Sequence, residues 1–80
     1  MASQPLYGVV ARALNVPTAS IADDTSPDTL RRWDSLRHLD LMTAVEDAYG
    51  VRFTTAEILG AKSVGDIRKL LHKKGLEVAD

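Results

Sequence analysis

Residues 33–50 read WDSLRHLDLMTAVEDAYG, and this stretch decides the fold. It predicts an amphipathic helix over residues 35–49, which Gly50 ends as a C′ residue in the left-handed conformation. Asp34 and Ser35 can each cap the first turn, because both side chains offer an oxygen that accepts a backbone N–H. If Asp34 is the cap, the Ser35 hydroxyl can point outward, where another enzyme could modify it. An anion attached to that hydroxyl would lie near the positive end of the helix dipole.

The predicted helix has two apolar stripes. At 100° per residue, one arc of about 160° holds its core face, which consists of Leu41, Met42, Ala44, Val45, Ala48 and Tyr49. The second stripe lies on nearly the opposite side and comprises Leu36, Leu39 and Thr43, flanked by Asp40, Glu46 and Asp47. Either the preceding loop folds over Leu36 and Leu39, or the stripe is a docking surface with acidic edges. The two interpretations are compatible if the loop covers only Leu36.

The rest of the chain also has helical periodicity. Apolar spacing predicts a first helix over about residues 6–14, with Ser3 as a plausible cap. A capping box at residues 54–57 precedes a short helix that stops near Gly60, and similar spacing at residues 63–66 begins a last helix. The fold class is therefore all-α, a four-helix bundle with a short third helix. Residues 15–34 form a long loop between the first two helices, which Ile21, Leu30 and Trp33 could pin to the bundle.

Composition narrows the function classes. The 80 residues predict a single domain over residues 1–80, with a core of about 4–74 and a frayed tail after Gly75. A net charge of −1 argues against nucleic acid as a partner. No apolar run is long enough to cross a membrane, and the N-terminus lacks the pattern of a signal peptide. The absence of cysteine favours the reducing cytoplasm as the compartment. We also expect a monomer.

Self-contained catalysis is not predicted. His38 follows Ser35 by three residues and could reach its hydroxyl, but no orienting acid or oxyanion hole is evident. Arg37 and His38 are interpreted as solvated first-turn residues. His38 and His72 are too far apart in the sequence for a metal site without further ligands. We therefore expect no catalytic residues and no metal.

Taken together, these features resemble an acyl carrier protein of the phosphopantetheine-binding family. The resemblance rests on Asp34-Ser35-Leu36 after a long loop, followed by LDLMTAVEDAYG and VRFTTAEILGAKSVGDIRKLL. It covers about residues 4–74 in the order and spacing usual for the family.

The resemblance implies that a phosphopantetheinyl transferase attaches 4′-phosphopantetheine to Ser35, with Asp34 and Leu36 completing the attachment motif. Acyl groups would be carried as thioesters on the thiol of that arm and presented to loading, transferring or condensing enzymes. The family's partner surface corresponds here to Leu36, Leu39, Asp40, Thr43, Glu46 and Asp47 on the second helix, with Ile58 on the third helix beside the arm.

Departures from the family pattern bear on the pathway. Arg37 and His38 stand where acidic or neutral residues are frequent, Thr43 replaces an apolar residue, and the third helix keeps only Glu57 of an acidic cluster. These differences favour a free-standing carrier of specialised metabolism, such as polyketide biosynthesis, over a carrier of primary fatty acid biosynthesis. Alternatives are an aminoacyl, peptidyl or hydroxyacyl carrier, and a helical interaction module without a prosthetic group. Peptidyl carriers more often have Gly-Gly-x-Ser at the attachment site, so residues 32–35 favour the acyl class.

Overall fold

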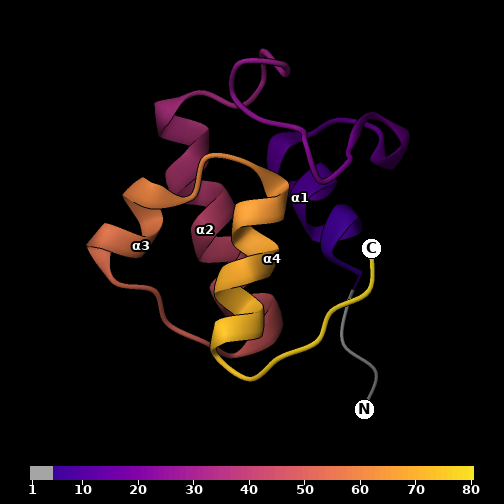
Figure 1. Cartoon of the computed structure of the whole chain (residues 1–80). Helices are drawn as coiled ribbons and strands as arrows, with labels where there is room; N and C mark the ends of the chain where they lie inside the picture. The colour runs from indigo at the N-terminus through magenta and orange to yellow at the C-terminus, as the bar shows by residue number, and fades with distance from the viewer. Residues whose placement is uncertain (1–4) are drawn as a thin grey trace.

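The computed structural model describes residues 5–80, and all regular secondary structure in that part of the chain is helical (Figure 1). The elements are α1 (Leu6–Leu14), a short 3₁₀ turn η1 (Thr18–Ser20), α2 (Ser35–Tyr49), α3 (Thr55–Gly60) and α4 (Val64–Lys73). The predicted all-α bundle with a short third helix and a long loop after the first is confirmed. The expected cap Ser3 lies outside the described residues, and Pro5 occupies the N-cap position of α1 without a side-chain hydrogen bond.

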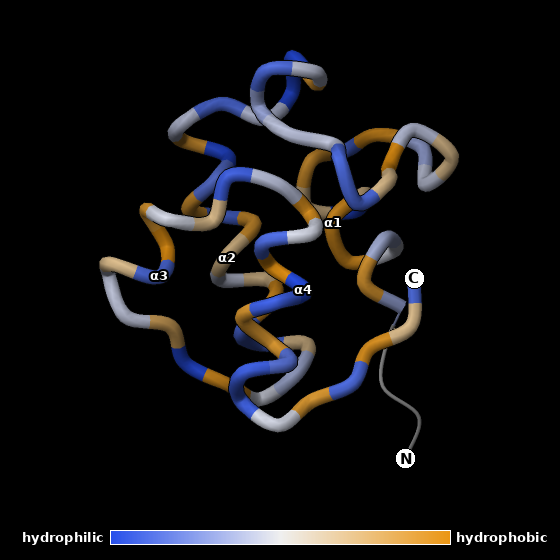
Figure 2. Tube along the Cα trace, viewed as in Figure 1, coloured by the Kyte–Doolittle hydropathy of each residue, from blue (hydrophilic) through white to orange (hydrophobic). Residues whose placement is uncertain are grey.

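The core lies between α1, α2 and α4, whose hydrophobic positions recur along each helix in Figure 2. On α2, the predicted core face is correct: Leu41, Met42 and Val45 are buried, and the remaining apolar residues of that arc pack against them. By contrast, α3 contributes no fully buried residue of its own. The short third helix is therefore held less by apolar burial than the other three.

The loop between α1 and α2 is packed rather than free. Ile21 and Trp33 are buried in the core, as predicted. The carbonyl oxygen of Asp23 accepts the backbone N–H of Gly65 at 2.8 Å, and the carbonyl oxygen of Thr25 accepts that of Val64 at 3.0 Å. Those two donors belong to the first turn of α4, where a helix leaves its N–H groups unpaired. A Cβ added at Gly65 would lie 3.2 Å from the Asp23 carbonyl oxygen, so this close approach favours glycine.

The C-terminal segment packs on the bundle, so the expectation of a frayed tail after Gly75 is wrong. Leu76 and Val78 pack against the core. The carbonyl oxygens of Ala79 and Asp80 accept the backbone N–H groups of the first two residues of α1, at 2.8 and 3.0 Å. Because α1 has no capping side chain, the tail satisfies donors that would otherwise lack a partner. Apolar periodicity did not reveal this pairing, because it joins the two ends of the described chain.

Asp23 ties the long loop to two helices. Its carboxylate accepts a hydrogen bond of 2.7 Å from the Tyr7 hydroxyl on α1, and bonds of 3.2 and 3.0 Å from Arg68 Nε and Nη2 on α4. The hydrogen bond from Tyr7, followed by those from Arg68, holds the pKa of Asp23 below its ordinary value. This polar cluster lies among α1, the loop and α4.

Candidate functional site

Ser35 is the first residue of α2 and is exposed. The capping role falls to Asp34, whose Oδ1 accepts the backbone N–H of Arg37 at 2.9 Å. Among residues 5–80, no group forms a hydrogen bond with the Ser35 hydroxyl. The helix therefore uses Asp34 as its cap, and the Ser35 hydroxyl is left available for modification.

A hollow of about 390 Å³ lies beside Ser35, between the start of α2 and the end of α3. Its lining is mostly apolar and consists of Pro27, Asp34, Ser35, His38, Leu39, Leu59, Ala61 and Lys62. Lys62 contributes a cation, and the N-terminus of α2 adds the partial positive charge of the helix dipole. A flexible group with a phosphate at one end and apolar parts beyond it fits such a lining.

His38 departs from the interpretation of a solvated first-turn residue. Its ring is half-buried and stacks on Trp33, with the ring centroids 5.9 Å apart. The Trp33 indole Nε1–H donates to His38 Nδ1 at 2.9 Å. His38 Nε2 lies 2.7 Å from the carbonyl oxygen of Ile58, which can only accept, so the neutral ring carries its proton on Nε2. His38 therefore links the end of the loop and the head of α2 to α3.

The outward stripe of α2 is open. Leu36 is 74% exposed and Leu39 is 54% exposed, and Thr43 is exposed as well. The loop does not fold over the two leucines, so the first interpretation of the stripe is wrong. Large exposed leucines next to each other on one helix face are typical of a binding surface.

The acidic edge of this stripe divides into two kinds of residue. Asp40 and Asp47 are exposed, as expected of a docking surface. Glu46 is half-buried, and its Oε2 accepts the backbone N–H of Phe53 at 2.8 Å. That carboxylate therefore holds the segment between α2 and α3 and is not simply an open acidic edge of the stripe.

On α3 the exposed residue is Leu59 rather than Ile58. Ile58 is half-buried and packs against the core, whereas Leu59 is 68% exposed and lines the hollow beside Ser35. The sequence did not separate these neighbours, because a helix of six residues has too few turns for a reliable apolar face. The lining residues that sequence reasoning did not assign to the site are Pro27, His38, Leu59, Ala61 and Lys62. For Leu59 and Lys62 the available signal was their place near the short helix: Leu59 lies in α3 after the capping box, and Lys62 follows the end of α3.

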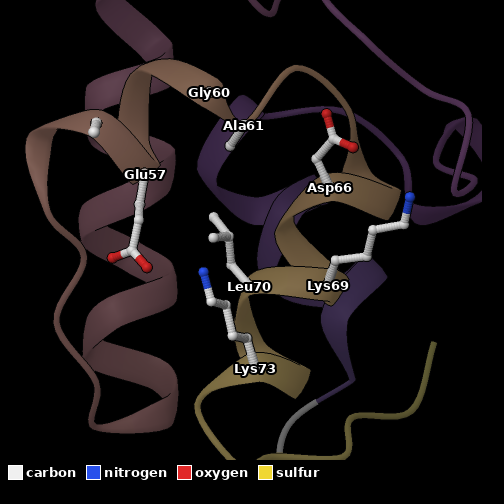
Figure 3. Close-up of a pocket in the computed structure, with 8 residues that line it drawn as sticks. Glu57, Gly60, Ala61, Asp66, Lys69, Leu70 and Lys73 are labelled. Carbon is white, nitrogen blue, oxygen red and sulfur yellow. The ribbon is translucent and has the colours of Figure 1, made fainter.

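A second hollow, of about 380 Å³, lies between α3 and α4 (Figure 3). Its carboxylates already have partners. Glu57 Oε1 accepts the backbone N–H of Thr54 at 2.8 Å and pairs with Lys74 Nζ at 3.2 Å, and these contacts lower the pKa of Glu57. Asp66 Oδ2 accepts the backbone N–H of Lys62 at 3.0 Å. No hydroxyl, thiol or imidazole lines this hollow, so it offers no attachment point.

Within residues 5–80, no group of three or more His, Cys, Asp or Glu side chains is arranged to hold a metal ion. None of the helices described for this chain is long and apolar enough to cross a membrane.

The comparisons with known proteins agree with this geometry. The family model described as "Phosphopantetheine attachment site" matches residues 4–71. The chain belongs to this family. It is similar to the solution NMR structure of a holo acyl carrier protein from Geobacter metallireducens, with 29% sequence identity and a TM-score of 0.76. That match covers 86% of this chain and 79% of the other. Among curated proteins, no match was found.

The protein is thus an acyl carrier protein of the phosphopantetheine-binding family, a carrier domain rather than a catalyst. The family's prosthetic group is a covalently attached phosphopantetheine. The lining beside Ser35 fits that group, because it combines an exposed hydroxyl at a helix N-terminus with a cation and an apolar surface.

Proposed function

We propose that Ser35 is the residue to which phosphopantetheine is attached. The observation that carries the proposal is the exposed, unpartnered hydroxyl at the first position of α2, beside a hollow in the part of the chain matched by the family model. In the transfer from coenzyme A, the Ser35 oxygen forms a bond to the phosphorus that bears pantetheine. The bond from that phosphorus to the nucleotide breaks, the nucleotide leaves, and the hydroxyl proton passes to a base of the transferase.

The residues around Ser35 support the arm in two ways. The N-terminus of α2 and the Lys62 ammonium favour the negative charge of the phosphodiester. Leu39 and Leu59 provide an apolar surface for the carbon chain that follows. The thiol at the end of the arm supplies the thioester chemistry when the group is bound.

The cargo proposal is an acyl intermediate of a specialised pathway, such as polyketide biosynthesis. Arg37 on α2 and Lys62 at the hollow reduce the acidity of the surface around Ser35. A near-neutral carrier suits partner enzymes whose docking sites are less basic than those that select strongly acidic carriers. Cytoplasmic location and a monomeric state remain predictions.

The proposed docking surface consists of Leu36, Leu39, Asp40, Thr43 and Asp47 on α2, together with Leu59 on α3. Its three leucines are the large exposed hydrophobic residues of the described chain. Burying the three leucines against a partner would provide binding affinity. The exposed aspartates would orient the partner and make its binding depend on salt concentration. A phosphopantetheinyl transferase and the acyl-handling enzymes would use this same surface in turn.

Intact-mass measurement tests the attachment residue. The protein is incubated with coenzyme A and a broad-specificity phosphopantetheinyl transferase, and we expect a gain of one phosphopantetheine group. Ser35→Ala should abolish the gain and retain the helical circular dichroism spectrum, since Asp34 is the cap. Ser20→Ala is the matched control, because Ser20 is also exposed but lies in η1, and it should be modified normally. Modification of Ser35→Ala would disprove the assignment.

The pathway proposal has its own experiment. Holo protein is offered to an acyl transferase of primary fatty acid synthesis and to one of a polyketide pathway, and thioester formation is measured. We expect faster loading by the polyketide enzyme. Equal or faster loading by the fatty acid enzyme would contradict the assignment to specialised metabolism. Loading only by an adenylating, amino acid-activating enzyme would favour an aminoacyl carrier.

A further inference from the structure

The proposed docking surface spans two helices that share few buried contacts. Leu36 and Leu39 lie on α2, whereas Leu59 lies on α3, which has no fully buried residue of its own. A partner that contacts all three leucines requires a fixed relation between the two helices. Some other interaction must therefore hold α3 at the correct place beside the head of α2.

His38 connects α2 to α3 at the residue directly before Leu59. Its Nε2–H donates to the carbonyl oxygen of Ile58 at 2.7 Å, and Ile58 is the residue directly before Leu59. The other side of the ring is held by the Trp33 indole N–H, at 2.9 Å to Nδ1, and by stacking on the same indole. Trp33 is only 1% exposed, so the histidine is attached to a buried residue of the core.

The other polar tie of α3 to a distant segment starts from Glu57, the residue directly before Ile58. Glu57 pairs with Lys74 of the segment after α4, and this contact joins α3 to α4 rather than to α2. It therefore cannot set the distance between Leu59 and the leucines of α2. Within residues 5–80, the hydrogen bond from His38 is the side-chain contact that joins α3 to α2.

We propose that His38 is a positioning residue for partner docking: its bond to Ile58 holds Leu59 in register with Leu36 and Leu39. This inference rests on the proposed function, because it requires that the surface around Ser35 docks a transferase. Losing the bond should release the end of α3 without unfolding the core, and it should weaken docking rather than the chemical step.

Two substitutions separate the two bonds of His38. In His38→Asn, the side-chain oxygen can take the place of Nδ1 and accept from Trp33, but the side chain is too short to reach Ile58. In His38→Gln, the terminal amide can take the place of Nε2 and donate to Ile58, while the acceptor for Trp33 is lost. His72→Asn is the matched control, because His72 is exposed near the end of α4.

The experiment measures steady-state kinetics of phosphopantetheinylation for the full chain. A typical internal hydrogen bond contributes about 0.5–1.5 kcal/mol, so His38→Asn should raise KM by about 2- to 10-fold, with kcat close to wild type. His38→Gln should raise KM less than His38→Asn does, yet shift the indole N–H resonance of Trp33, the single tryptophan. His72→Asn should change neither quantity. Equal KM values for the Asn and Gln variants would overturn the proposal.

Leu59→Ala keeps the test decisive even if a His38 variant folds poorly. Leu59 is largely exposed, so its truncation should leave the fold intact and raise KM. In the Leu59→Ala background, His38→Asn should add less than about 2-fold, because the positioned side chain is already gone. An unchanged KM for Leu59→Ala would disprove the positioning role. If the wild type itself gains no phosphopantetheine, the proposed function fails; if it is modified but the variants do not separate, only this inference fails.

Discussion

Truncating Leu36 to alanine should weaken docking far more than it weakens the fold. Full burial of a leucine side chain contributes roughly 1.5–3 kcal/mol. Because Leu36 is 74% exposed, a partner can bury about three quarters of it, which corresponds to about 1–2 kcal/mol and a roughly 5- to 30-fold increase in KM. The quarter already buried limits the loss of folding stability to below about 1 kcal/mol.

Steady-state phosphopantetheinylation measures the first quantity, and urea unfolding measures the second. Leu39→Ala, at 54% exposed, should give a smaller increase in KM, of about 4- to 15-fold. Leu41→Ala is the opposite control: Leu41 is fully buried on the other face of α2, so it should cost about 2–5 kcal/mol of stability. A Leu36→Ala variant with wild-type KM would refute the docking role. One as unstable as Leu41→Ala would refute the assignment of helix faces.

Three other predictions concern stability. Glu46→Ala should lower the free energy of unfolding in urea by about 1–2 kcal/mol, because the backbone N–H of Phe53 loses its carboxylate acceptor. Glu46→Gln should retain most of that stability, and equal losses for the two variants would exclude the hydrogen bond as the cause. The pKa of Asp23 is lowered on folding, so its contribution to stability is present above its ordinary value of 3.8 and is lost as pH falls through the folded pKa. The loss of stability should be small, because the Asp23 side chain is 53% exposed. Asp23→Asn should flatten this part of the pH–stability profile, and an unchanged profile would show that Asp23 is not the titrating group. Gly8→Ala in α1 should stabilise the fold by about 0.5–1 kcal/mol and so raise the thermal midpoint, because alanine favours the helix and a Cβ there meets nothing within 4 Å. A lower midpoint would show that the added methyl group does not fit at this position.

Features that depend on nearby residues were predictable from the sequence. The side chain of Asp34 accepts from Arg37, three residues away, and Thr54 forms a complete capping box with Glu57. The end of α2 at Gly50, with φ of 67°, also follows from a single residue. Each of these interactions lies within one helical turn, so the chain spacing alone identifies both partners.

Features that join distant segments were not predictable in the same way. Periodicity assigns a residue to a face but does not identify what that face meets. Glu46 was placed on the edge of an open stripe, and only the path of the chain back over α2 brings the Phe53 N–H to its carboxylate. His38 likewise reaches Ile58 across 20 residues. The apolar stripe at Leu36 was predictable from the helical spacing, but whether the loop covers it was left open for the same reason.

The same distant contacts support the proposal that another enzyme modifies Ser35. A serine becomes a nucleophile when an adjacent base accepts its proton. His38 is the nearby candidate, but its Nδ1 already accepts from Trp33 and its Nε2–H already donates to Ile58. The Asp34 carboxylate caps the helix. With the His38 ring and the Asp34 carboxylate committed to the fold, the hydroxyl has no base of its own, so in the proposed attachment the base comes from the transferase.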